Sequence, residues 1–154
     1  AQALSLAKEE LRNTQLEAKF IRADFINFRD FIETPQDVIW VGFSVHHLDT
    51  PNKLEFMKKV KETLSEGGIF MLYEPIFIEG EDRELYFKRF KRTYYIHWNG
   101  LTKEEGESLL EHVRESEKPE TRENWIKLGE DAGFINAEKI FSEQTGLYEM
   151  FKYS

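Results

Sequence analysis

Cysteine is absent from the 154 residues of this sequence. That absence excludes disulfide bonds, thiolate metal sites and cysteine nucleophiles, and it fits a reducing compartment, so we expect a cytoplasmic protein. Long hydrophobic runs are missing too. No apolar stretch reaches the roughly 18 residues that a membrane span needs, and the first residues have no signal-peptide pattern. We therefore expect a soluble protein without a membrane partner.

An excess of positive charge is also lacking. The formal net charge is -8 and the pI is near 5.1, whereas proteins that hold a phosphate backbone rely on clustered Lys and Arg. We therefore expect no nucleic-acid partner. The run KRFKR at residues 88–92 is a local exception, which we interpret as the solvated face of an aromatic-rich helix. An anion-binding or nucleic-acid-binding patch is the alternative.

Glycine is present but not in the pattern that binds nucleotides. None of the nine glycines forms G-x-G between a predicted strand and a predicted helix. Core-forming residues are plentiful by contrast, because hydrophobic residues make up 40% of the chain and aromatic residues 14%. A chain of this length and composition can bury one sizeable core. We predict a single domain over residues 1–154.

The first part of the chain has a helical pattern followed by two strand patterns. Residues 4–18 place leucines and alanines at helical spacing among charged residues. Residues 20–23 read as a short strand whose far end carries Asp24. Residues 37–44, DVIWVGFS, are apolar on both faces. That continuity is typical of a buried parallel strand.

A crossover helix and a further strand follow. Thr50 supplies an N-cap and Pro51 a first-turn proline, and the helix is predicted to run to the Gly67-Gly68 pair. Residues 69–77, IFMLYEPIF, form the next apolar strand. A strand, a crossover helix and a strand imply a parallel pair with a right-handed connection. The fold class is therefore α/β.

The second half of the sequence predicts three helices and then a β hairpin. Thr102 and Glu105 form a capping box, Gly133 ends the last helix, and Thr145-Gly146 is a hairpin signal. The helices are predicted over residues 81–98, 102–117 and 121–134, and the hairpin strands over residues 135–144 and 147–154.

Three segments carry a resemblance to a known family: DVIWVGFSVHHLD at residues 37–49, LSEGGIFMLYEP at residues 64–75 and LGEDAGF at residues 128–134. In this order, with Asp24 after a strand, they resemble class I methyltransferases of the small-molecule type, which use S-adenosylmethionine. The resemblance covers essentially the whole chain. It implies a Rossmann-like methyltransferase sheet with a C-terminal antiparallel hairpin.

The sequence departs from that family at its front end. The family's first strand with its glycine-rich loop, and its second strand with an acidic end, have no counterpart here. In the family's sheet these strands lie between the third and fourth, so their absence would leave two strand edges unpaired. Three explanations stay open: a fragment of a longer enzyme, two copies that complete each other as a homodimer, or a third strand moved beside the fourth. We favour an N-terminally incomplete domain and expect this chain alone to be inactive.

The resemblance implies an S-adenosylmethionine site at the carboxyl ends of the strands, where open α/β sheets bind ligands. Asp24 would accept a hydrogen bond from the adenine amino group, and the backbone N–H of Phe25 would face the ring. Phe43, Ser44 and Val45 would pass close to the sulfonium. A role for Asp24 as a turn or cap residue is the alternative.

The adjacent pair His46-His47 directly follows the strand at residues 37–44. A histidine is suited to remove a proton from a hydroxyl or ammonium acceptor at neutral pH. We therefore predict that one of the two is the catalytic base. Because neighbouring side chains on an extended segment point to opposite faces, we expect the other to have different surroundings. The alternative is that both histidines are structural.

Three further residues are predicted to contact the substrate. Glu74 lies toward the carboxyl end of the strand at residues 69–77, and Tyr94 and Trp98 belong to the aromatic insert in which the family builds its acceptor lid. His97 and His112 have no acidic partner at ligand spacing, so we predict no metal site.

Two function classes remain after these steps. The first is a methyltransferase for a small molecule, of which this chain carries the back of the cofactor site and the acceptor lid. The second is a methyltransferase-like binding or partner subunit without catalysis. A nicotinamide-dependent oxidoreductase is disfavoured, because its glycine loop is also absent. No motif specifies the methyl acceptor.

Overall fold

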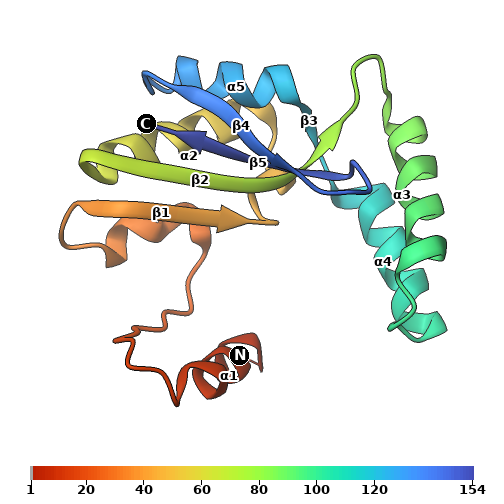
Figure 1. Ribbon diagram of the computed structural model, residues 1–154, viewed down its shortest axis with the longest axis horizontal. Coiled ribbons are helices and arrows are strands. Elements are labelled where there is room, and N and C mark those ends of the chain that lie inside the picture. The colour runs from red at the N-terminus through yellow and green to blue at the C-terminus, as the bar shows by residue number, and fades with distance from the viewer. Residues whose placement is uncertain (1) are drawn as a thin grey trace. The chain divides into compact units, whose positions relative to one another are not determined.

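The computed structural model describes residues 2–154, with side chains from Leu4 onward. The chain divides into two compact units, Ala1–Thr34 and Pro35–Ser154. Figure 1 shows the sheet and most of the helices in the second unit. The single domain over residues 1–154 stays a prediction.

The N-terminal unit contains one helix and one 3₁₀ helix. Helix α1 spans Gln2–Leu11 and the 3₁₀ helix η1 spans Phe25–Phe31. The first of these is shorter than predicted. Both the backbone N–H and the hydroxyl of Thr14 donate to the carbonyl of Leu11 and close the helix there.

The strand predicted at residues 20–23 is wrong, because these residues form no strand. A strand needs a hydrogen-bonded neighbour for its backbone, and no strand of the described sheet pairs with this segment. Asp24 instead caps η1, since its carboxylate accepts the N–H of Ile26 at 3.1 Å. The observed geometry of Asp24 is therefore that of a cap residue.

The second unit contains the predicted strand-helix-strand unit. The two strands pair in parallel, which confirms the α/β prediction. The first strand, β1, spans Gln36–Gly42, the helix α2 spans Thr50–Thr63, and the second strand, β2, spans Leu64–Phe77.

Both ends of α2 differ from the prediction by a few residues. The N-cap is Asp49 rather than Thr50, and its carboxylate accepts the N–H of Asn52 at 3.0 Å. The helix ends at Thr63 rather than at Gly67-Gly68, because Leu64 already has extended backbone and pairs with β1. Thr50 is a residue type that caps helices, but its neighbour Asp49 is the residue whose side chain accepts a backbone N–H of the first turn.

The sheet has the order β1-β2-β5-β4, and the two-residue strand β3 (Glu120–Thr121) pairs with the end of β2. The last two strands, β4 (Ala137–Ser142) and β5 (Tyr148–Tyr153), form the predicted antiparallel hairpin. Gly146 has a φ of 71° in the connecting turn, a conformation that glycine adopts without steric cost.

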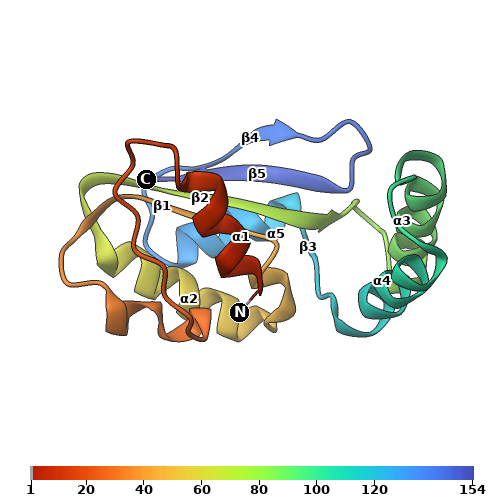
Figure 2. The same cartoon turned by 90° about the horizontal axis from the view of Figure 1, so that it is seen from below.

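Helices α2 and α5 (Arg122–Asp131) lie against the same face of the sheet, as Figure 2 shows. That face presents Phe70, Leu72, Phe151 and Tyr153, all fully buried. Gly129 on α5 permits this packing, since a Cβ there would lie 2.3 Å from the ring of Tyr153.

Helices α3 (Arg83–His97) and α4 (Lys103–Ser116) pack against each other beyond the end of β2 (Figure 1). The predicted capping box of Thr102 and Glu105 at the start of α4 is confirmed. The two helices share one buried cluster, made of Tyr86, Phe90, Leu110, Val113 and Leu147. This pair of helices forms the insert that was predicted to be the acceptor lid.

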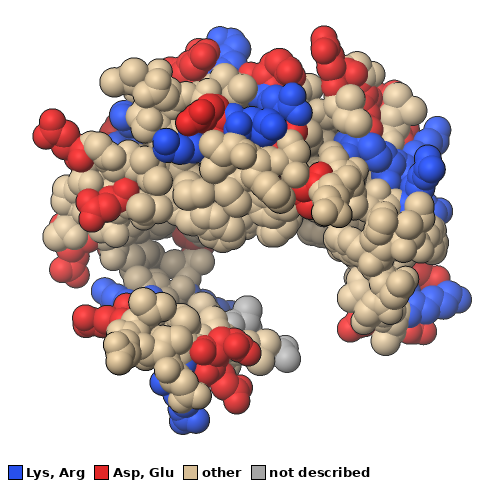
Figure 3. Space-filling model, viewed as in Figure 1, with Lys and Arg blue, Asp and Glu red and all other residues tan. Residues whose placement is uncertain are grey.

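One edge of the sheet is formed by β1, which pairs on one side only among the described residues. Val38 and Trp40 are 54% and 56% exposed on this strand. In the view of Figure 3, uncharged residues form a band along the lower part of this unit, and its charged residues gather above the band and at its ends.

Several predicted features can be compared with the described residues directly. The run at 88–92 lies on α3, where Lys88, Lys91 and Arg92 are exposed, as expected for a solvated helix face. No described helix is long and apolar enough to cross a membrane. In the described part of the chain, no three His, Asp or Glu side chains are arranged to hold a metal ion.

Candidate functional site

The site begins where β1 ends, at a strained turn. Phe43 follows the last residue of β1 and has a φ of 53°, which is a rare conformation for a bulky side chain. Its N–H still donates to the carbonyl of Tyr73 on β2, at 3.0 Å. Backbone strain of this kind costs roughly 1–3 kcal/mol and persists only where surrounding contacts hold it.

Glu74 on β2 supplies those contacts. Its Oε1 accepts the N–H groups of Ser44 and Val45, at 3.0 and 2.8 Å. Its Oε2 accepts from Nδ1 of His46 at 2.5 Å. The carboxylate is 0% exposed, so all of its bonding is internal. Glu74 therefore fixes both the turn and the orientation of His46.

The two histidines lie on the 3₁₀ helix η2 (Val45–His47) rather than on extended chain. The two side chains still have different surroundings, because His46 is buried against Glu74 whereas His47 is partly exposed and lies near the carbonyl of Ser116. The ring centroids of His46 and His47 are 4.1 Å apart, and the ring of His47 is 5.1 Å from that of His112. Both neighbours reach the same cavity.

The environment of His47 makes it a weak base. Its Nδ1 approaches the carbonyl of Ser116 at 3.5 Å. Burial, followed by repulsion from His46, lowers the pKa of His47 below its ordinary value. The ring is therefore neutral at neutral pH.

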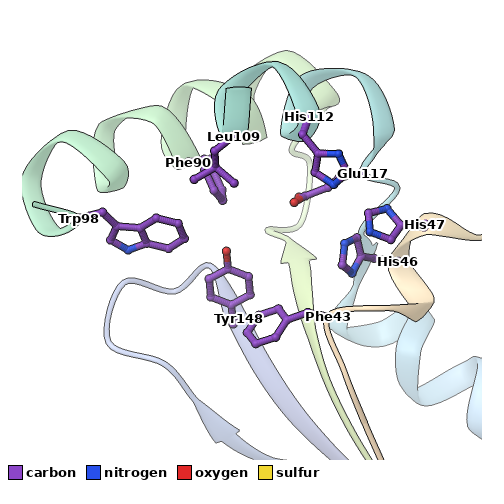
Figure 4. Close-up of a pocket in the computed structure, with 9 residues that line it drawn as sticks. All are labelled: Phe43, His46, His47, Phe90, Trp98, Leu109, His112, Glu117 and Tyr148. Atoms are coloured by element: carbon purple, nitrogen blue, oxygen red, sulfur yellow. The ribbon is translucent and has the colours of Figure 1, made fainter. Parts of the chain in front are cut away.

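A cavity of about 340 Å³ opens beside these histidines. Side chains from the end of β1, η2, α3, α4 and β5 surround it, and Figure 4 shows them facing one another across the space. Most of its wall is aromatic. The lining residues are Phe43, His46, His47, Phe90, Trp98, Leu109, His112, Glu117 and Tyr148.

Glu117 is the acidic residue of this cavity, and no sequence motif indicated it. It follows the last residue of α4, and its Oε2 accepts the hydroxyl of Tyr86 at 2.7 Å. Burial raises the pKa of Glu117 above its ordinary value. Figure 4 shows the carboxyl group of Glu117 and the hydroxyl of Tyr148 both pointing into the cavity.

A buried network holds the segment that carries Glu117. The backbone N–H of Lys118 donates to the carbonyl of His46 at 2.9 Å. Lys53 on α2 is fully buried, and its Nζ contacts the carbonyl of Lys118 at 2.5 Å and Oε1 of Glu120 at 2.7 Å. Burial lowers the pKa of Lys53. These bonds join the end of α4 to the turn that follows β1.

The other predicted site residues are placed in different ways. Trp98 lines the cavity. Tyr94 lies behind it, 6.3 Å between ring centroids, and packs on Gly106, where a Cβ would meet its hydroxyl. The prediction that Glu74 contacts the substrate is not matched by the geometry, because this buried residue does not line the cavity. Asp24 and Phe25 belong to the N-terminal unit.

Comparisons with known proteins agree on one family. Residues 1–72 match a family described as "Methyltransferase domain". The fold is similar to the solved structure named "PigF with SAH", with a TM-score of 0.62 and 16% identity. It is also similar to the mitomycin 7-O-methyltransferase MmcR, with a TM-score of 0.62 and 13% identity. No curated protein matches.

The matched region is nearly all of this chain but less than half of each solved chain. Each match covers 99% of this chain, but 41% and 39% respectively of the two solved chains. The sequence therefore spans about two fifths of the length of these structures. At this level of identity, the likeness establishes the fold.

Part of this chain fits the cofactor that the resemblance implied. Phe43 is 49% exposed at the carboxyl end of β1, and its ring meets those of Tyr73 and Tyr148 edge-on at 5.1 Å. An exposed aromatic ring suits a cationic sulfonium. The amides of Ser44 and Val45 are bonded to Glu74, so they are not open to a ligand.

The α/β sheet, the C-terminal hairpin and the family match agree with one another. The prediction made from the sequence motifs is confirmed at the level of the fold. Residues 1–72 match the methyltransferase-domain family, and the chain as a whole has the fold of the solved mitomycin 7-O-methyltransferase MmcR.

Proposed function

We propose that this chain supplies the acceptor side of an active site in which a methyl group passes from S-adenosylmethionine to a small molecule. The observation that carries the proposal is the hydrogen bond between Glu74 and His46 beside a cavity of about 340 Å³. Cavities of this size are typical of small-molecule sites. Its place at the carboxyl end of β1 is where open α/β sheets bind ligands.

His46 is the proposed catalytic base. Because an ionised carboxylate has no hydrogen to donate, Nδ1 of His46 carries the proton that bonds to Glu74, and Nε2 keeps a lone pair. Glu74 is a positioning residue that holds this tautomer, as third groups do in other catalytic pairs. The proton of the acceptor's O–H or N–H passes to Nε2, and the carboxylate stabilises the imidazolium.

His47 is the second candidate for the base, and we propose a supporting role for it. Its lowered pKa keeps the ring neutral while His46 takes the proton. A neutral imidazole can both donate and accept a hydrogen bond, so His47 can orient the acceptor. Among the other predicted contacts, Trp98 forms a wall of the cavity and Tyr94 supports it from behind.

The donor side of the proposal concerns five residues. When bound, the cofactor supplies an electrophilic methyl group whose carbon–sulfur bond breaks with the electron pair left on sulfur. Phe43 would face the sulfonium, and Ser44 and Val45 would shape the turn beside it. Asp24 keeps one carboxylate oxygen apart from its cap bond and remains proposed for the adenine amino group, with Phe25 for the ring.

Titration of S-adenosylhomocysteine into the 154-residue chain, followed by NMR, tests this proposal. NMR detects millimolar affinities, which suits a chain that was expected to carry only part of the cofactor site. We expect shifts centred on residues 42–47, weakened by Phe43→Ala but not by Tyr95→Ala, which changes an exposed ring on α3. Unchanged spectra at millimolar ligand would contradict the proposal for this chain.

The alternative is a methyltransferase-like partner subunit without catalysis. It predicts no cofactor-induced shifts, and a cavity that still binds small molecules. The proposal also includes a small-molecule acceptor, no nucleic-acid or membrane partner and a cytoplasmic location. Completion of the sheet by a second copy predicts a dimeric mass in solution, which light scattering measures.

A further inference from the structure

Four glutamates are buried in the described part of the chain: Glu74, Glu117, Glu120 and Glu149. Three of them meet a basic side chain. Glu74 bonds to His46, Glu120 to Lys53 and Glu149 to Arg122, with distances between 2.5 and 2.9 Å.

Glu117 differs from the other three. It is 8% exposed, and its one hydrogen bond within the described residues comes from the neutral hydroxyl of Tyr86. A buried carboxylate without a cationic partner is costly unless something compensates its charge. The partner of Glu117 is therefore to be sought in what the cavity binds.

The walls around Glu117 suit a cation. Trp98, Phe90, Tyr148 and Phe43 line the same space, and Figure 4 shows the carboxyl group of Glu117 directed toward its centre. The faces of aromatic rings attract cations, most strongly where water is excluded. A carboxylate within aromatic walls combines the two kinds of group that recognise an organic ammonium.

Burial has the larger effect on the pKa of Glu117 and raises it, whereas His46 and His112 lower it, and no histidine is hydrogen-bonded to Glu117 among the described contacts. His46 turns its Nδ1 to Glu74, and His47 has a lowered pKa and so is neutral at neutral pH. His112 lines the cavity but is exposed to solvent, and it makes no hydrogen bond to Glu117 among the described contacts. Among the residues that the structure describes, no Lys or Arg side chain lines the cavity.

We propose that the acceptor molecule carries a protonated amine, which Glu117 binds within the aromatic walls of the cavity. This inference rests on the proposed function, because it names the substrate class of that site. The size of the cavity adds a limit. A volume of about 340 Å³ equals that of roughly eleven waters at about 30 Å³ each, which suits a compact aromatic amine.

Three probes of nearly equal size test the charge preference: 2-phenylethylamine, 2-phenylethanol and 3-phenylpropionate. Calorimetry gives their affinities, and the NMR signal of the Trp98 indole shows whether they enter the cavity. We expect the amine to bind at least tenfold more tightly than the alcohol, and the anion to bind more weakly than both. Equal binding of amine and alcohol, or no binding of any probe at millimolar concentration, would overturn the inference.

The variant Glu117→Gln separates charge from shape. Its amide oxygen can still accept the hydroxyl of Tyr86, so we expect the alcohol to bind as before while the tenfold preference for the amine disappears. Glu115→Gln is the matched control, because it removes an exposed carboxylate from the same helix. A preference that survives in Glu117→Gln contradicts the inference. If that variant does not fold, the comparison of the three probes in the unmodified chain still decides.

These titrations need no cofactor, so the two proposals can fail separately. A clear amine preference without shifts from S-adenosylhomocysteine would contradict the proposed methyl transfer and leave amine recognition standing. Shifts from S-adenosylhomocysteine without an amine preference would contradict amine recognition and leave the proposed methyl transfer standing.

Discussion

Replacement of Glu74 tests whether this residue organises the turn after β1 through its acceptors or through its charge. The variant Glu74→Ala removes the acceptor for the N–H groups of Ser44 and Val45 and for Nδ1 of His46. The variant Glu74→Gln keeps one carbonyl oxygen, which can still accept from both amides. The two variants should therefore differ strongly in stability.

The magnitudes follow from burial. In Glu74→Ala a fully buried amide at Val45 and a partly buried one at Ser44 lose their partner, at about 1–3 kcal/mol each. The buried imidazole of His46 loses its acceptor as well, so we expect a total near 4 kcal/mol. In Glu74→Gln only the charge assistance is lost, and we expect about 1–2 kcal/mol.

Urea unfolding followed by circular dichroism measures both free energies of unfolding, and long-range ¹⁵N NMR reports the tautomer of His46. In the unmodified chain we expect the proton on Nδ1. In Glu74→Gln the amide NH₂ faces that nitrogen, so the proton should move to Nε2. If the two variants lose equal stability, or if the tautomer stays unchanged in Glu74→Gln, the role assigned to Glu74 is wrong.

Three further predictions concern stability. Burial raises the pKa of Glu117, so the folded chain loses stability as pH rises from about 4.5 through the folded-state pKa. The variant Glu117→Gln should remove this loss and stabilise the chain by roughly 1 kcal/mol at pH 7. Thermal unfolding across pH 4–8 measures both effects. Burial alone would raise the pKa of Glu149, but hydrogen bonds, chiefly from Arg122, outweigh it and lower that pKa. Arg122→Met should therefore cost about 2 kcal/mol at pH 7, with the gap to the unmodified chain closing as pH falls toward 3 in urea unfolding. Gly129→Ala should cost about 1–3 kcal/mol by forcing a ring out of place, whereas Gly100→Ala, which meets no neighbour, should leave the melting temperature nearly unchanged.

The predicted part of the candidate site depended on local signals. Trp98 and both histidines were named from the sequence and do reach the cavity. Glu74 was predicted to contact the substrate, but it contacts His46 instead. It is buried because β2 is paired with a strand on both sides. His46 and His47 do have different surroundings, but the extended backbone from which this was predicted is absent, because the chain turns into η2 at Val45.

Glu117 and Tyr148 were missed, and no sequence pattern distinguishes them. Glu117 is one of many acidic residues near the end of a helix, and its burial arises only because α3 brings Tyr86 against it. Tyr148 opens a strand with ordinary alternation. Their common cavity exists because α3, α4 and β5 converge on the end of β1.

The sequence by itself determined the elements whose causes are local. The strand-helix-strand unit, the capping box at Thr102 and the hairpin turn at Gly146 depend on residues a few positions apart. Only the tertiary structure decided the site, since its bonds join residues far apart in the chain: 28 positions for His46 and Glu74, and 31 for Tyr86 and Glu117. Periodicity and capping act within a few turns of chain, whereas the burial that gives these carboxylates their chemistry arises when separate elements pack together.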